Sequence, residues 1–143
     1  MFTSSLLDIP RPFVDPIMSL VEVLGIVSLS IRRPLSSSMV ALFLNSDRCA
    51  VGLSQVATSD TAPAHHLVAS ASRVPSVHSV VLVSSRPHCL VRSSDVAHLQ
   101  SFTRAAHNAG FALCDWVVVG RGGMYCPRTL TDLPNPWPTP LSF

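Results

Sequence analysis

Two runs of mainly β-branched and aromatic residues constrain the fold of this chain most strongly. They are Val77–Val83 and Phe111–Val119, and neither alternates regularly between apolar and polar residues. This pattern is typical of central strands in a sheet that is covered on both faces. Between the runs, Ser93 can cap a helix that has Asp95 in its first turn, where a carboxylate suits the helix dipole. Gly110 can end that helix, so the sequence predicts buried strands covered by helices.

Shorter elements are predicted on either side of these strands. Turn-forming residues at 45–47 separate two apolar segments, which indicates a hairpin. Pro63 lies in the first turn of an amphipathic helix whose apolar residues follow at i, i+3, i+4 and i+7. The glycine-rich segment 120–123 turns the chain into a last short strand. The predicted order is therefore β-β-α-β-α-β-β, with the outer strands at 39–44, 49–56 and 124–126.

The two ends of the chain are predicted to lie outside this domain, which is assigned residues 39–128. Residues 1–38 are interpreted as an arm and a helix that runs from Asp15-Pro16 to about Leu24, followed by a short strand at 26–31. Residues 129–143 are interpreted as an extended, proline-rich tail. The side chains of the N-terminal helix expected to face a core are Met18, Val21, Val23 and Leu24, and Gly25 is expected to end the helix.

The composition limits the classes of function. Hydrophobic residues make up 48% of the 143 residues and charged residues 13%, with a net charge of +2. This charge is too small to predict nucleic-acid binding by itself, whereas a sparsely charged surface favours protein association. The apolar stretch 16–31 contains Glu22 and is shorter than the roughly 20 residues of a membrane helix, so no membrane span is expected. The four cysteines form no Cys-x-x-Cys pair, so neither a zinc ribbon nor a thioredoxin-like site is suggested. Because nothing marks the chain as secreted, reduced thiols in the cytoplasm are expected.

Four local motifs follow one another in a definite order. Val40–Asn45 opens the first strand and hairpin, and the helix after it leads into Val80–Val83. That strand is followed by the sequence Ser-Ser-Arg-Pro at 84–87 and by Asp95 near a helix start. Leu113–Gly120 ends in three valines and a glycine. In this order the motifs resemble the RadC branch of the JAB/MPN (JAMM) metallopeptidase-like family, which carries His-x-His-Pro, Ser-x-x-Asp and Leu-Asp-His-aliphatic-Val-Gly at these places.

The resemblance implies both a fold and a lost site. The fold is α/β (α+β), a small mixed β-sheet flanked by helices, of the cytidine-deaminase-like or JAB/MPN type. In the family, two histidines and the aspartate hold one Zn²⁺, and a glutamate acts as base for the metal-bound water. Here the histidine positions are Ser84 and Arg86, while the aspartate position, Asp95, is kept. The glutamate is expected near Leu53 and Ser54, where this chain has no carboxylate.

These replacements predict that the family's zinc chemistry is absent. An arginine has no lone pair to offer a metal, and its positive charge repels a dication. No catalytic residue, cofactor or metal is therefore expected at Ser84, Arg86 and Asp95. We expect Arg86 either to pair with Asp95 across the vacated site or to point into solvent.

Other residues have both a functional and a structural interpretation. His88 and Cys89 could rebuild a zinc site with Asp95, joined by His98, or they are ordinary loop residues. Asp115, in an apolar strand, is interpreted as a buried structural acceptor. Trp137 either binds a partner or folds back on the domain. His65 and His66 are interpreted as surface residues, and segment 120–123 as a hairpin turn. Dispersed surface charge is the interpretation for Arg32, Arg33, Arg92 and Arg104.

The sequence thus favours a non-catalytic, RadC-like interaction module that binds a protein partner or a second copy of the chain. A link to DNA repair or mobile elements is implied by the resemblance alone. The alternatives are a divergent zinc metallopeptidase that uses His88, Cys89 and Asp95, and a weak nucleic-acid binder.

Overall fold

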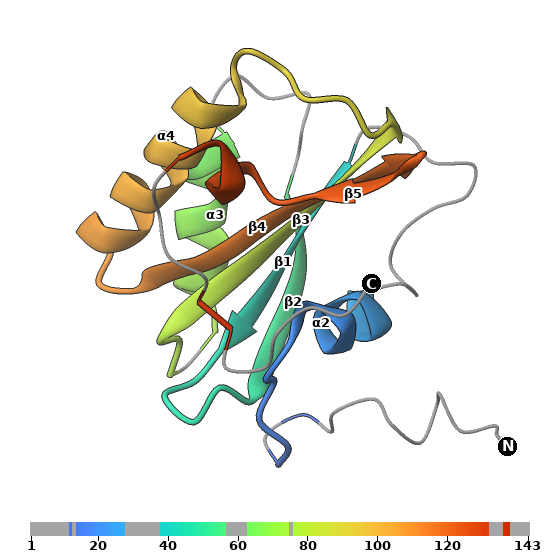
Figure 1. The fold of residues 1–143 in the computed structure, drawn as a ribbon. Coiled ribbons are helices and arrows are strands. Elements are labelled where there is room, and N and C mark those ends of the chain that lie inside the picture. Colours follow the sequence, from blue (N-terminus) through green and yellow to red (C-terminus); the bar gives the residue numbers. More distant parts are fainter. Residues whose placement is uncertain are drawn as a thin grey trace, which may run out of the picture.

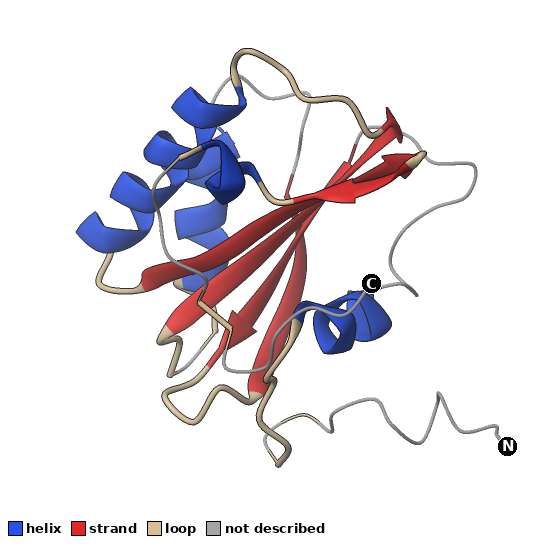
Figure 2. Cartoon of the chain, in the orientation of Figure 1, coloured by secondary structure: helices blue, strands red, loops and turns tan. Residues whose placement is uncertain are grey.

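The computed structural model describes residues 12, 14–27, 38–56, 63–74, 76–131 and 136–137. These residues form one five-stranded sheet with helices on both faces (Figures 1 and 2). The elements follow the predicted order β-β-α-β-α-β-β, which confirms the expected α/β class. They are α2 (Leu20–Val27), β1 (Ser38–Leu44), β2 (Ala50–Val56), α3 (Pro63–Ala71), β3 (Ser79–His88), α4 (Asp95–Asn108), β4 (Ala112–Arg121), β5 (Gly123–Tyr125) and the 3₁₀ helix η2 (Pro127–Leu130).

The sheet is mixed, with strand order β2-β1-β3-β4-β5. Only β3 and β4 are parallel to each other, and the other neighbours are antiparallel. A parallel pair requires a crossover connection, which is α4 here. The start of α4 therefore lies near the end of β3, and this proximity positions the site described below.

Two hydrophobic cores lie on the two faces of the sheet. The first core is formed with α3 and α4 and contains Trp116 and Phe102, whose rings meet edge to face at 5.5 Å between centroids. The second core is formed with α2 and includes Trp137. Residues predicted to lie outside the domain thus belong to its core, and the predicted boundaries at 39 and 128 leave part of that core out. The N- and C-terminal contributors to the second core are Ile17, Leu20, Val23, Val27 and Trp137.

The N-terminal helix differs from the prediction in position and in orientation. It begins at Leu20 and continues through Gly25 to Val27. The start follows from a Ser-x-x-Glu pattern, because Ser19 Oγ accepts the backbone N–H of Glu22 and Glu22 Oε1 accepts the N–H of Met18. The predictions that Met18 and Val21 face a core were wrong. The strand predicted at 26–31 does not begin at Ile26, because Ile26 and Val27 belong to the helix. Met18 and Val21 are exposed, whereas Leu24 is partly buried against the second core.

Strand β3 is longer than predicted. The predicted strand ended at Val83, but β3 continues to His88, with an irregular register after Ser85. The polar residues there suggested a loop, yet Ser84, Ser85 and Arg86 are all buried. Their polar groups find partners inside the structure, which the local pattern does not reveal.

No helix among the described residues is long and apolar enough to cross a membrane. The longest of them, α4, has 14 residues, fewer than the roughly 20 that a span requires.

The end of β3 approaches β4 closely at Gly120. A Cβ atom at this position would lie 2.6 Å from the backbone N of Cys89 and 2.8 Å from the carbonyl oxygen of Arg86. These are backbone atoms, so they cannot move aside as a flexible side chain would. Only glycine fits at position 120 without displacing the segment that carries Arg86.

We predict that Gly120→Ala destabilises the protein by about 3 kcal/mol, because it forces this segment away from β4. Gly122→Ala is the matched control. At Gly122 the added Cβ meets open space, and the cost of about 1 kcal/mol comes from the positive φ of 97° alone. Urea unfolding followed by circular dichroism measures both. Equal effects of the two substitutions would show that the close approach does not matter.

Candidate functional site

The structure brings Arg86 and Asp95 together, which is one of the two alternatives that the sequence left open. Arg86 lies near the end of β3, and Asp95 is the first residue of α4. The guanidinium Nη2 donates to Asp95 Oδ1 at 2.8 Å and Nη1 donates to Oδ2 at 3.2 Å. Both oxygens of the carboxylate therefore accept from one guanidinium, the bidentate geometry that makes such pairs strong. The alternative in which Arg86 points into solvent is wrong, because its side chain is only 8% exposed.

Tyr125 is the third member of this network. Its hydroxyl donates to Asp95 Oδ2 and accepts from Arg86 Nη1 at 3.1 Å. The sheet register explains this placement. Ser84 pairs with Val118, and Val118 pairs with Tyr125, so the three side chains lie in one row on one face of the sheet. We refer to Arg86, Asp95 and Tyr125 as the ionic network.

The loop between β3 and α4 is fastened to the ionic network by its backbone. Asp95 Oδ2 accepts the N–H of Arg92 at 2.9 Å. The carbonyl oxygen of Leu90 lies 3.4 Å from both Arg86 Nη1 and the Tyr125 hydroxyl. The N–H of Cys89 donates to the carbonyl of Arg121 at 3.1 Å. These bonds hold residues 89–92 over the network and leave Asp95 with no exposed surface.

Ser84 forms its hydrogen bond with a residue outside the ionic network. Its hydroxyl accepts the indole N–H of Trp116 at 2.8 Å. The centroid of the Trp116 ring lies 6.0 Å from the guanidinium carbon of Arg86, which is within the range of a cation–π contact. Ser84, the residue predicted to replace the first motif histidine, thus carries a hydroxyl that is bonded to Trp116.

The network changes the acidity of its members. Burial acts to raise the pKa of Asp95, but hydrogen bonds from Arg86, Tyr125 and the N–H of Arg92 outweigh it and hold this pKa below its ordinary value. Burial acts to lower the pKa of Arg86, and Asp95 reverses this effect. Burial, together with the hydrogen bond to Asp95, raises the pKa of Tyr125. At neutral pH the network is an ion pair with a protonated tyrosine as a second donor.

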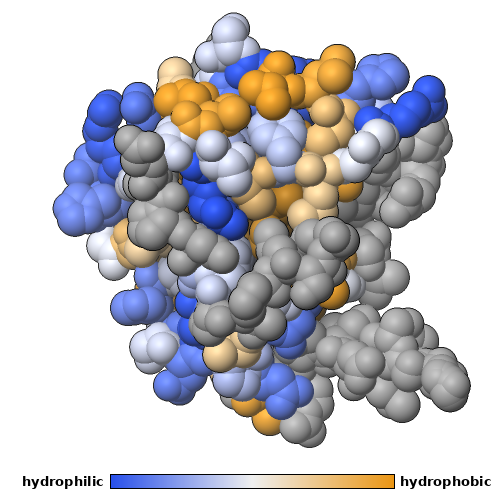
Figure 3. Space-filling model, viewed as in Figure 1, coloured by the Kyte–Doolittle hydropathy of each residue, from blue (hydrophilic) through white to orange (hydrophobic). Residues whose placement is uncertain are grey.

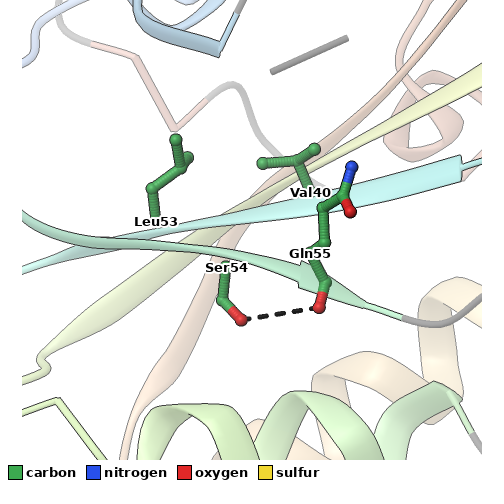
Figure 4. A pocket seen from close by; sticks show the side chains of 4 residues that line it. All are labelled: Val40, Leu53, Ser54 and Gln55. Atoms are coloured by element: carbon green, nitrogen blue, oxygen red, sulfur yellow. Dashed lines mark hydrogen bonds between the residues drawn. The ribbon is translucent and has the colours of Figure 1, made fainter. Parts of the chain in front are cut away.

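The two positions expected for the family glutamate lie on opposite faces of the sheet. Leu53 pairs with Leu42 of the second core, whereas Ser54 pairs with Ala41 of the first core and its hydroxyl donates to Ser70 of α3. Figure 4 shows their side chains pointing away from each other beside a cavity of about 280 Å³. Only Ser54 shares the face of the ionic network. Neither residue has a carboxylate that could act as base.

The alternative zinc ligands are not gathered into a site. Among the described residues, no group of three His, Cys, Asp or Glu side chains could hold a metal ion. His88 is exposed at the end of β3, and both oxygens of Asp95 are bonded to Arg86. Burial raises the pKa of Cys89 although Arg86 opposes this, so its thiol is not activated as a metal ligand.

The remaining sequence candidates have structural roles or lie at the surface. Gly120–Gly123 forms the β4–β5 hairpin, as predicted. His98, Arg92 and Arg104 are exposed. Arg32 and Arg33 lie outside the described residues, as do the side chains of His65 and His66 on α3.

Asp115 is a buried acceptor, as predicted. Its Oδ2 accepts from Arg128 Nε at 3.1 Å and from the indole N–H of Trp137 at 2.8 Å. Trp137 therefore folds back onto the domain. The neighbouring thiols are not activated: burial raises the pKa of Cys114, and burial together with Asp115 raises that of Cys126 to about 12.

Sequence reasoning missed the roles of Tyr125 and Trp116. Tyr125 was assigned only to a short strand, although it is the one tyrosine of the chain and follows a glycine-rich turn. Its meeting with Asp95 depends on the β4–β5 register, which the local sequence does not specify. The sequence signal for a role of Tyr125 was an aromatic residue with a hydroxyl group in a predicted short strand.

Comparison with models of known protein families finds no match to this chain, and no curated protein matches it. The resemblance to the RadC branch therefore stays a prediction from the motifs.

We predict that Asp95→Asn removes a specific part of the dependence of stability on pH. The folded-state pKa of Asp95 is lowered, so its contribution is present above the unfolded pKa of about 3.9 and is lost as the pH falls toward the folded value. The difference in unfolding free energy between wild type and variant should thus be large at neutral pH and shrink below about pH 4. Asp47→Asn, at an exposed turn, is the control for loss of a charge. A difference that stays constant with pH would contradict the proposed strength of the pair.

Proposed function

We propose that this chain is a non-catalytic, RadC-like JAB/MPN domain that acts as a protein-interaction module. The observation that carries the proposal is the bidentate pair between Arg86 and Asp95. The two groups approach each other at the positions where the resemblance places a zinc ligand pair. An arginine in this place keeps the carboxylate compensated without any metal.

The residues present do not fit a zinc ion. A catalytic zinc takes three protein ligands and leaves one position open. Here the two oxygens of Asp95 accept hydrogen bonds from Arg86, and the hydroxyl of Ser84 is bonded to Trp116. Removing Arg86 from the pair would cost several kcal/mol, because the buried carboxylate would lose its partner.

The loop between β3 and α4 supports the proposed role in protein interaction. Leu90 and Val91 are 67% and 58% exposed, although the backbone around them is bonded to Arg86, Asp95 and Tyr125. Figure 3 shows hydrophobic residues gathered over the loop that joins β3 to α4 in Figure 1. Apolar side chains on a fixed loop lose little conformational freedom on binding, which favours association. The network thus keeps an apolar surface ready for a protein partner or a second copy of the chain.

We predict that the purified wild-type protein retains far less than one zinc per chain after dialysis and does not hydrolyse peptides. Elemental analysis by mass spectrometry measures the metal. Ser84→His/Arg86→His, which restores the His-x-His spacing opposite Asp95, is the variant expected to gain zinc. Stoichiometric zinc in the wild type that disappears in Asp95→Asn would refute the proposal and favour the metallopeptidase alternative.

We predict that the wild-type protein self-associates between micromolar and submillimolar concentrations, and that Leu90→Ser/Val91→Ser reduces this association. Sedimentation velocity measures it. Val21→Ser, which changes an apolar residue on α2 that is 52% exposed, is the control and should leave association unchanged. A wild-type chain that remains monomeric throughout, or association that is insensitive to the double substitution, would contradict a role of this loop in self-association.

A further inference from the structure

A second buried polar cluster surrounds Trp137, on the face of the sheet opposite the ionic network. Trp137 is only 4% exposed, although it belongs to no helix or strand. Its indole N–H donates to Asp115 Oδ2 at 2.8 Å. The guanidinium carbon of Arg48 lies 5.2 Å from the ring centroid, in cation–π range. One face and one edge of the indole are therefore recognised by charged groups.

The groups that contact the indole are positioned by other parts of the structure. Asp115 is held by Arg128 of η2 at 3.1 Å and by the N–H of Trp116 at 2.8 Å. Arg48 Nε donates to the carbonyl of Ile17 at 3.0 Å. None of these bonds involves Trp137. These bonds position the contacting groups from the β1–β2 turn, β4 and η2.

A β-bulge in β4 orients Asp115 toward this slot. Val80 pairs with Leu113 but Val81 pairs with Asp115, so Cys114 is an extra residue in the ladder. The shift places Asp115 beside Val81, which belongs to the second core. Without the extra residue the carboxylate would point to the other face, because a shift of one residue reverses every side chain of a strand.

Arg48 is held in a conformation that is uncommon for a residue with a side chain. Its φ is +64°, in the left-handed region, at the end of the β1–β2 turn. One of its Nη atoms is buried without a hydrogen-bond partner among the described residues. A left-handed backbone at a residue with a side chain and a buried Nη without a hydrogen bond are both unfavourable by themselves. Their presence beside the ring indicates that this position is organised around an aromatic group.

We propose that Arg48, Asp115 and Arg128 form a recognition slot for a tryptophan in a proline-rich peptide, and that this chain's own Pro136-Trp137 segment occupies the slot in cis. Four prolines at positions 134, 136, 138 and 140 surround the tryptophan in sequence. Such segments are already extended before they bind, so little conformational entropy is lost. A cavity of about 220 Å³ beside Pro136, lined in part by Leu113, Cys114 and Arg128, leaves room for flanking residues. The slot favours tryptophan over phenylalanine because Asp115 Oδ2 accepts a hydrogen bond from the N–H of the aromatic ring.

The test uses the full-length Trp137→Ala protein and a labelled synthetic peptide of residues 132–143. We expect the peptide to bind saturably, measured by fluorescence anisotropy, and to raise the melting temperature of the variant. Wild-type protein should bind at least about tenfold more weakly, because its slot is filled. A peptide with Phe in place of Trp137 and the Asp115→Asn/Trp137→Ala protein should each lose about tenfold in affinity.

Each outcome decides the proposal. A folded Trp137→Ala protein that does not bind the peptide at submillimolar concentration overturns it, as does equal binding of the Phe peptide. If Trp137→Ala does not fold, the peptide must restore its folded circular dichroism spectrum. Trp137→Phe, which fills the slot without the N–H donor, should then bind the wild-type peptide more tightly than wild-type protein does. The proposal does not depend on the zinc content or on the Leu90 surface, so its failure would leave the proposed function unaffected.

Discussion

The buried carboxylate of Asp95 is the constraint on which the site depends. A charge without solvent exposure must be compensated within the structure, and Arg86 does this with two hydrogen bonds. The ion pair also positions neighbouring parts of the structure. It orients Tyr125 of the edge strand, holds the backbone of the loop before α4, and places a cation over Trp116. Three strands and a helix are therefore linked through one ionised group.

Much of the fold could be predicted, because its signals are local. The apolar runs and the turn residues identified both central strands, both helices on the first core and the β4–β5 turn, although the N-cap of α4 is Ser94 and not the predicted Ser93. The sequence offered the pairing of Arg86 with Asp95 as one of two alternatives, and only the structure decides between them. Errors arose where partners distant in sequence decide the outcome. The polar end of β3 is a strand because Ser84 and Arg86 find partners on β4, α4 and β5. Met18 precedes α2, whose start is set by the Ser19–Glu22 capping interaction, and Val21 is exposed because α2 buries Leu20, Val23 and Val27 instead.

The charges of the two buried aspartates are compensated in the same way on opposite faces of the sheet. Each carboxylate pairs with one arginine and accepts from one aromatic donor, Tyr125 for Asp95 and Trp137 for Asp115. They differ in where the aromatic donor comes from. Tyr125 is fixed by the register of β5, whereas Trp137 follows η2 at a distance of several residues. The backbone of Tyr125 is held by the β4–β5 ladder, whereas that of Trp137 belongs to no helix or strand.

The position of Trp137 also has a consequence for how the chain acquires its structure during translation. The other residues of the second core, from Ile17 to Cys126, are all synthesised before it. As the chain leaves the ribosome, the face of the sheet under α2 therefore stays incomplete while the first core, whose last members are Val118 and Tyr125, can already assemble. Domains that fold from the N-terminus during synthesis expose such unfinished apolar surface for as long as its last contributor is missing. For this protein that interval ends only when the indole reaches Asp115.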